Sequence, residues 1–187
     1  ATAVDEMETR PLPFRLRSLG LAGNQMTDNG LQKLCHSLGE LIKLHQDLGS
    51  GNYRLPLTEL QLGFNRLGDE GARKLARFFN MHMDALKLEH IDLSHAGMTA
   101  RGVSLILSAL ATSCRTLSTL SIKGNGSVNI HVLHALTRLL VEAPALTSLQ
   151  CQLSKQNCLD LLADKEAVAA VRPVCCIGHR SHEHHGK

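Results

Sequence analysis

The sequence predicts an α/β solenoid of about five strand–turn–helix coils, with a parallel sheet on the concave face and helices on the convex face. Two observations lead to this prediction. The frame L-x-x-L-x-L-x-x-N-x-L fits the chain five times in constant order. Within LQLGFNRLGDEGARKLARFF, residues 60–79, the apolar residues first alternate as in a strand and then recur at spacings of three and four, as in a helix.

The five units follow one another at nearly regular intervals. They are spaced by 41, 31, 29 and 29 residues, counted between their first leucines, which are Leu16, Leu57, Leu88, Leu117 and Leu146. Only the first step is much longer than the repeat length expected for a strand and a helix, about 20 to 29 residues. The extra material falls within residues 39–56, and we expect Tyr53 to project from this insertion near a helix-to-strand junction.

Each unit is predicted to form one strand, one turn and one helix. In the second unit, Leu60 and Leu62 would face the interior, because they alternate with polar residues. Asn65 follows where the backbone leaves the strand, and its amide can satisfy backbone groups of adjacent turns. Asp69 is expected to act as a cap or first-turn acid of a helix that buries residues at spacings of three and four, namely Ala72, Leu75, Ala76 and Phe79.

The repeat also resembles a known family. The phrase N-x-L-x-D-x-G-A-x-x-L-A at residues 65–76, its relative at residues 24–35 and the step near 29 residues are similar to ribonuclease-inhibitor-type leucine-rich repeats. The resemblance covers residues 14–165. Related repeats occur in Ran GTPase-activating protein, NOD-like receptors, tropomodulin and axonemal regulatory subunits, so the resemblance implies a fold without selecting one function.

The segments outside the repeats are predicted to cover the two ends of the solenoid. We expect an N-terminal arm at residues 1–13, a C-terminal cap at residues 166–178 and a disordered His-rich tail at residues 179–187. The cap is expected because the repeat pattern weakens toward the end of the chain. A stack of coils requires such an atypical terminal unit.

The segment CCIGHRSHEHH is the most tempting cluster of potential metal ligands. Thiolates and imidazoles suit zinc or copper, which makes Cys175, Cys176, His179 and His182 candidates. Their spacing matches no closed structural zinc pattern, so a capping strand followed by a polar tail is the preferred interpretation. We therefore expect no cofactor.

Composition bears on the partners and on the compartment. The formal net charge is +3 and no long basic run occurs, which argues against nucleic acid as a partner. No apolar run reaches the roughly 20 residues that cross a bilayer, so no membrane insertion is expected. The six cysteines lie mostly among leucines without the spacing of a disulfide scaffold. We expect a reducing intracellular compartment, the cytoplasm first, with an organelle left open if a targeting segment was removed.

The predicted concave face carries polar residues and no enzyme motif. His90, Asp92 and Ser94 alternate along one strand, where they form a row and cannot converge on one reacting atom as a catalytic triad must. We expect a non-enzymatic protein–protein interaction scaffold without a small-molecule substrate, an accessory subunit of a larger assembly. The alternative is a GTPase-regulating module similar to Ran GTPase-activating protein. The candidate contact residues on the face and its rim are Glu59, Gln61, Phe64, His90, Asp92, Ser94, His95, Ser121, Lys123, Gln150 and Gln152.

Overall fold

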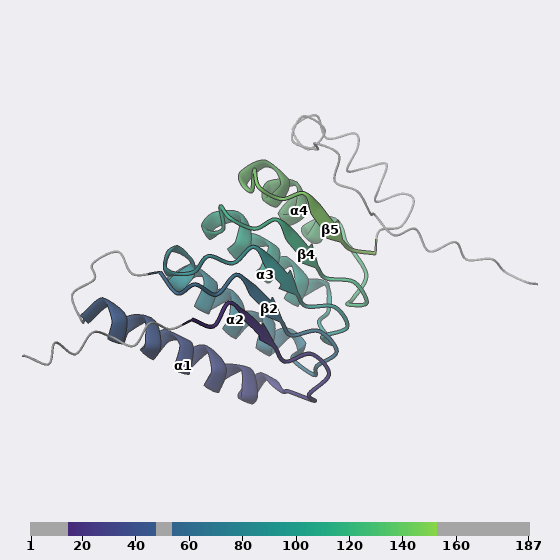
Figure 1. The fold of residues 1–187 in the computed structure, drawn as a ribbon. Coiled ribbons are helices and arrows are strands. Elements are labelled where there is room, and N and C mark those ends of the chain that lie inside the picture. The colour runs from purple at the N-terminus through teal and green to yellow at the C-terminus, as the bar shows by residue number, and fades with distance from the viewer. Residues whose placement is uncertain (1–14, 48–53, 153–187) are drawn as a thin grey trace, which may run out of the picture.

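The computed structural model describes residues 15–47 and 54–152. Strands and helices alternate along these residues (Figure 1). The strands are β1 (Ser18–Gly20), β2 (Glu59–Gln61), β3 (His90–Asp92), β4 (Thr119–Ser121) and β5 (Ser148–Gln150). The helices are α1 (Asp28–Asp47), α2 (Gly68–His82), α3 (Ala100–Ser113) and α4 (Ile130–Glu142), with a short 3-10 turn, η1 (Met83–Ala85), after α2.

The five strands form one parallel sheet in the order β1-β2-β3-β4-β5. Figure 1 shows the helices lying together on one side of this sheet and leaving its other side uncovered. The central residue of each strand pairs with the central residue of the next, in a row made of Leu19, Leu60, Ile91, Leu120 and Leu149. The predicted solenoid and its register are therefore confirmed, and the fold is a leucine-rich-repeat solenoid.

The core lies between the sheet and the helices. Leu60, Ile91 and Leu120 point into it from the strands, and Leu75 and Phe79 meet them from α2; all five are buried. Because one strand and one helix together expose a whole apolar side, each coil depends on its neighbours for this burial. The low aromatic content is consistent with this core, which leucine, isoleucine, valine and alanine fill in repeating layers.

The first helix accounts for part of the predicted insertion. Helix α1 has 20 residues, whereas α2, α3 and α4 have 15, 14 and 13. The apolar spacing continues along it, so that Leu38 and Ile42 are buried while Leu44 is exposed. An ion pair of 2.8 Å between Asp28 and Lys74 links α1 to α2. Tyr53 lies outside the described residues, as do the predicted arm, cap and tail.

A buried asparagine connects the first two coils. Asn65 is only 3% exposed, and its Oδ1 accepts hydrogen bonds from the backbone N–H groups of Asn24 at 3.1 Å and Met26 at 2.8 Å. Its Nδ2 donates to the carbonyls of Leu21 at 2.8 Å and Leu62 at 2.9 Å, with a longer contact to a third carbonyl. The predicted role of Asn65 is confirmed, because it serves backbone groups where both strands end.

In the third coil, backbone groups at the strand exit find hydrogen-bond partners without an asparagine. Ala96 occupies the asparagine position, and its backbone carbonyl accepts hydrogen bonds from the N–H groups of Leu67 at 3.0 Å and Gly68 at 3.1 Å. In the fourth coil an asparagine again occupies this position. Asn125 Oδ1 accepts hydrogen bonds from the backbone N–H groups of Ala96 and Met98. The buried backbone groups are thus satisfied in both arrangements, by a side-chain oxygen or by a main-chain oxygen.

Asp69 joins the second coil to the third. It lies in the first turn of α2, as predicted, but it caps the beginning of α3 rather than that of its own helix. Its Oδ1 accepts from the N–H groups of Thr99 at 2.8 Å and Gly102 at 3.1 Å, and its Oδ2 from the Thr99 hydroxyl at 2.6 Å. These bonds, the Thr99 hydroxyl first, lower the pKa of Asp69 against the opposing effect of burial.

Among the described residues, no helix is both long and apolar enough to cross a bilayer.

Replacing Asn65 with alanine is expected to lower the free energy of unfolding by about 3 kcal/mol or more, because several buried backbone groups lose their partner. Asn24→Ala is the matched control. Its side chain is exposed and, among the residues that the structure describes, donates only to the Ala22 carbonyl, at 3.3 Å, so we expect a loss of about 0.5 kcal/mol or less. Urea unfolding followed by circular dichroism gives both values; equal losses would contradict the role assigned to Asn65.

Asp69→Asn is expected to destabilise the protein most at neutral pH. The folded-state pKa of Asp69 is lowered, so its stabilisation is present above the pKa of the unfolded chain and is lost as the pH falls below about 4. The difference in unfolding free energy between Asp69→Asn and the unsubstituted protein should therefore shrink between pH 7 and pH 3. A difference independent of pH, measured by urea unfolding, would show that the charge of Asp69 contributes nothing.

Candidate functional site

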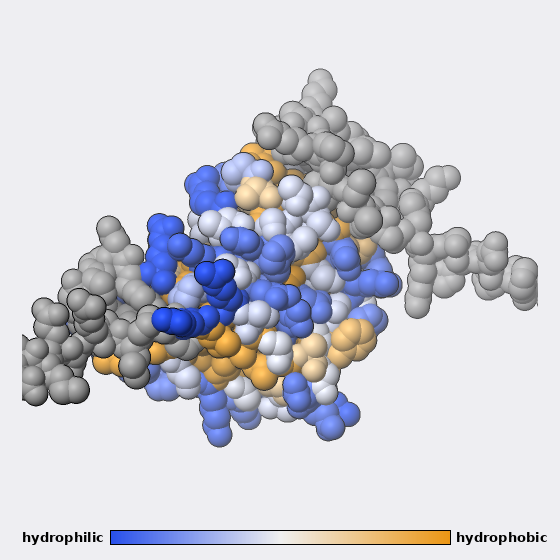
Figure 2. Space-filling model, in the orientation of Figure 1, coloured by the Kyte–Doolittle hydropathy of each residue, from blue (hydrophilic) through white to orange (hydrophobic). Residues whose placement is uncertain are grey.

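The uncovered side of the sheet forms a concavity of about 470 Å³ across β2 to β5. Figure 2 shows hydrophilic and neutral side chains over the sheet, with hydrophobic side chains gathered near β1 and α1 at the N-terminal edge. The concavity is lined by strand residues and by residues just after the strands. Among them are ten of the eleven predicted contact residues: Glu59, Gln61, Phe64, His90, Asp92, Ser94, His95, Ser121, Lys123 and Gln150.

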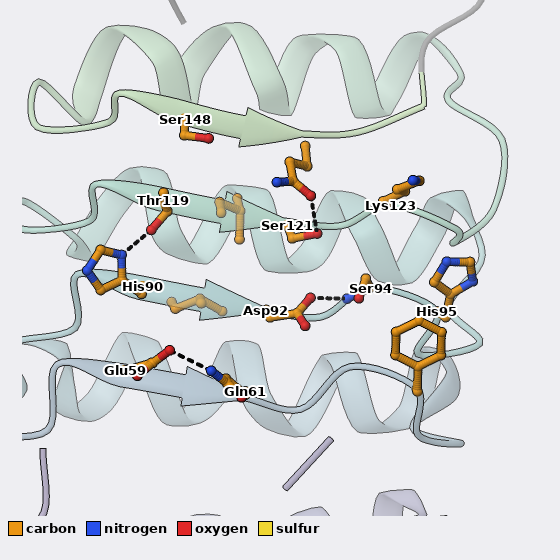
Figure 3. Close-up of a pocket in the computed structure, with 14 residues that line it drawn as sticks. Glu59, Gln61, His90, Asp92, Ser94, His95, Thr119, Ser121, Lys123 and Ser148 are labelled. Carbon is orange, nitrogen blue, oxygen red and sulfur yellow. Dashed lines mark hydrogen bonds between the residues drawn. The ribbon is translucent and has the colours of Figure 1, made fainter. Parts of the chain in front are cut away.

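Polar side chains on this face bond to one another along and across the strands (Figure 3). Gln61 donates to Glu59 at 2.5 Å, and His90 shares a hydrogen bond with the hydroxyl of Thr119. The Ser121 hydroxyl donates to Gln150 at 3.4 Å. The sheet therefore presents a prearranged polar surface. Gln152, the remaining predicted residue, is half-buried beyond the end of β5.

Ser94 is an exception to the predicted exposure of this face. It lines the concavity but is only 7% exposed, so the expectation that it stands in solvent is wrong. The reason is local. The chain has left β3 at this point, and the backbone N–H of Ser94 donates to Asp92 Oδ1 at 2.8 Å. Its hydroxyl lies close beside Gly63 of the preceding coil, which leaves little surface open.

An aromatic pair stands at the rim where the strands end. The rings of Phe64 and His95 stack with a centroid distance of 4.6 Å and an interplanar angle of 18°. Phe64 is 61% exposed, which is unusual for a phenylalanine in a chain whose Phe78 and Phe79 are buried. The ring of His95 also lies against Gly124, where an added Cβ would come within 2.3 Å of it. The pair is therefore held in place from one side.

Both aromatic residues have left-handed backbone conformations. The φ angles are 55° at Phe64 and 50° at His95. Gly23 and Gly124 occupy the same position, directly before the asparagine position, and have φ angles of 72° and 73°. Glycine adopts this conformation freely, whereas another residue loses about 1–2 kcal/mol. At this position two coils thus have a glycine without backbone strain. The other two have an aromatic residue whose backbone is strained and whose ring lies at the rim.

The charges of the concave face are mixed. The pKa of the Glu59 carboxyl lies below its ordinary value, first because of a hydrogen bond from the Ser18 side chain and then because of Gln61, with the charge of nearby His90 adding a smaller effect. Glu59 is therefore anionic at neutral pH. Lys123 makes no ion pair with any residue that the structure describes. Carboxylates thus lie on β2 and β3, and a free ammonium group lies after β4.

A second groove, of about 780 Å³, lies between α1 and α2. Its charged lining residues include Lys43, Arg73, Lys74 and Arg77, and Met81 at its border is 60% exposed. The repeat pattern does not predict this groove. The helical period predicts which residues of α2 are exposed. It does not predict how far α1 lies from α2, and this distance opens the groove.

The remaining candidate chemistry receives no structural support. The Cys175, Cys176, His179 and His182 candidates lie outside the described residues. Within residues 15–47 and 54–152, no group of three or more potential ligands gathers to hold a metal ion. Burial raises the pKa of Cys35 to about 11 and also raises that of Cys114, so both thiols are protonated packing groups.

Comparison with known proteins agrees with the observed repeats. Three segments, residues 15–35, 56–76 and 85–107, match the family model described as Leucine Rich repeat. No curated protein matches the sequence. The chain is similar to a solved structure described as "Leiomodin-1 Actin-Binding Site 2 (ABS2)", with a TM-score of 0.57 and 16% sequence identity over 81% of this chain and 80% of that chain. At this identity the likeness shows the fold alone.

Phe64→Gly is expected to leave the free energy of unfolding within about 1 kcal/mol of the unsubstituted value, because relief of the left-handed strain offsets the lost stacking and the added chain entropy. Phe79→Ala is the contrast. This ring is fully buried, and its removal should cost about 3–5 kcal/mol. Urea unfolding of both variants tests the comparison, and a large loss for Phe64→Gly would assign the exposed ring to stability.

Proposed function

We propose that the chain is a non-enzymatic protein-binding scaffold whose concave face and strand-exit rim contact the partner. The observation that carries the proposal is the exposed Phe64–His95 pair, which is strained and stacked beside an ordered polar surface. Strained residues persist where the surrounding structure holds them, and they concentrate at functional sites. An exposed aromatic ring beside hydrogen-bonding groups is also the usual composition of an interface anchor.

The rigidity of the sheet supports the same proposal. Glu59, His90 and Thr119 stand side by side on three adjacent paired strands, and their spacing is fixed by the backbone ladder at about 4.8 Å per strand. A partner that fits this spacing loses little of its binding energy to ordering the scaffold. The extended row of polar groups suits a protein surface or a peptide segment.

We further propose that the repeats are of the ribonuclease-inhibitor type and that the chain is an accessory subunit of a larger assembly. The later steps near 29 residues, with a full helix in each of the first four coils, support the first part. The similar solved structure is described as an actin-binding site, so actin is a partner to test by cosedimentation. Stimulated GTP hydrolysis with candidate GTPases tests the alternative of a GTPase-regulating module.

Charge reversal on the concave face is expected to abolish partner capture. The variant carries Glu59→Lys, Asp92→Lys and Lys123→Glu, which replace the charges that a bound surface would face. Affinity capture followed by mass spectrometry should show partners of the unsubstituted chain that are lost with this variant. Arg77→Glu on the exposed convex side is the matched control and should retain them.

An unchanged set of captured proteins with the triple variant would show that the concave face is not the binding surface. The folded state of each variant is verified by circular dichroism before capture. Loss of partners with Arg77→Glu alone would instead assign binding to the helical side, where the groove between α1 and α2 lies.

A further inference from the structure

We propose that the concave site receives an arginine side chain of the partner protein, with its guanidinium on the open face of the Phe64 ring and paired with the carboxylate of Asp92. The inference rests on the proposed protein-binding function and specifies the chemistry of its central contact. It follows from one carboxylate and one exposed ring that line the same concavity.

Asp92 and Phe64 are brought together by Gly63. An added Cβ at Gly63 would lie 2.7 Å from Asp92 Oδ2, so this oxygen lies directly over the residue that precedes Phe64. Any side chain at position 63 would collide with the carboxylate. The absence of a side chain at Gly63 therefore leaves room for the Asp92 carboxylate over the backbone just before Phe64, and Asp92 and Phe64 line the same concavity, in which Figure 3 shows Asp92 on β3.

The Asp92 carboxylate retains an oxygen for a partner. Its Oδ1 accepts from the Ser94 N–H at 2.8 Å, which fixes the orientation of the group. Its Oδ2 takes no hydrogen bond from any residue in the part of the chain that the structure describes. Two N–H donors of a guanidinium can approach such an oriented carboxylate, and charge-assisted bonds of this kind are about twice as strong as neutral ones.

The Phe64 ring also retains an open face. His95 covers one face at a centroid distance of 4.6 Å, and the side chain nevertheless stays 61% exposed. Gly124 and the left-handed backbone at both positions fix the stacked pair. A cation that lies over an aromatic face is attracted by the electrons of the ring, and arginine does this more often than lysine because its guanidinium is planar.

The remaining charges around the site favour a cation over an anion. Glu59 and Asp92 contribute two carboxylates to the lining, and Lys123 contributes one ammonium group. The two histidines, His90 and His95, are hydrogen-bonded or stacked within the protein. An acidic partner segment would face two carboxylates, whereas an arginine is complementary both to the carboxylates and to the exposed ring.

The test uses a phage-displayed library of random twelve-residue peptides, selected on the complete chain. Arginine should be enriched at one position of the selected peptides. A synthetic peptide of the consensus sequence is then measured by fluorescence anisotropy beside its arginine-to-lysine version. The lysine version should bind about tenfold more weakly, because it lacks the planar fork and most of the stacking.

Variants of the protein locate the contact. Phe64→Gly and Asp92→Asn should each weaken the consensus peptide by about tenfold or more, since each removes one of the two groups that hold the guanidinium. The controls are Met81→Ala, another exposed apolar residue, and Asp84→Asn, another exposed acid, and both should bind as the unsubstituted chain does. Equal urea midpoints for Phe64→Gly and Asp92→Asn separate loss of binding from loss of fold.

Three outcomes would overturn the inference. They are a library without arginine enrichment, equal binding of the arginine and lysine peptides, and unchanged binding to Asp92→Asn. If selected peptides lacking arginine still require Phe64, the proposed binding function stands and only the chemistry of the contact is wrong. If selected peptides bind both variants as well as they bind the unsubstituted chain, the concave face is not the binding surface and both proposals fall.

Discussion

The structure depends on the satisfaction of backbone groups where each strand ends. At this point the chain leaves the ladder, turns beneath the sheet and enters a helix, so its N–H and C=O groups are buried without regular partners. Asn65 and Asn125 supply those partners from side chains, and Ala96 supplies them from its own carbonyl. The same bonds run from one coil to the next, so local satisfaction of the backbone also produces the stacking that buries the leucines.

The turn after each described strand exit also determines which side chains reach the rim of the concave face. The residue before the asparagine position must adopt a left-handed conformation, and glycine does so at Gly23 and Gly124 without strain. Phe64 and His95 occupy the same position at a cost in stability, and their rings reach the rim of the concave face. A backbone conformation shared by the first four coils is thus, in two adjacent coils, the site of an exposed aromatic pair that lines the same concavity as Asp92.

The sequence predicts the parts of this structure that follow from periodicity. The strands, their parallel order and the row from Leu19 to Leu149 all follow from five repeated frames. Apart from the role of Asn65, the contacts between coils do not follow from the sequence, because they depend on the distance between elements: Asp69 caps the helix of the next coil, and Ser94 is covered by its neighbours. Alternation along the strands predicts the polar residues of the concave face, and the position after the strands predicts Phe64 and His95 at the rim. The stacking of Phe64 on His95 depends on backbone angles that no local pattern reveals.

Amide hydrogen exchange at the strand exits tests the central claim most directly. We expect the amides of Met26 and Met98, which donate to Asn65 and Asn125, to exchange as slowly as the amide of Leu62 in the sheet ladder. They should become exchangeable only when the whole solenoid unfolds. Exchange of either amide at the rate of an exposed loop, while Leu62 stays protected, would contradict the claim that these asparagines hold the coils together.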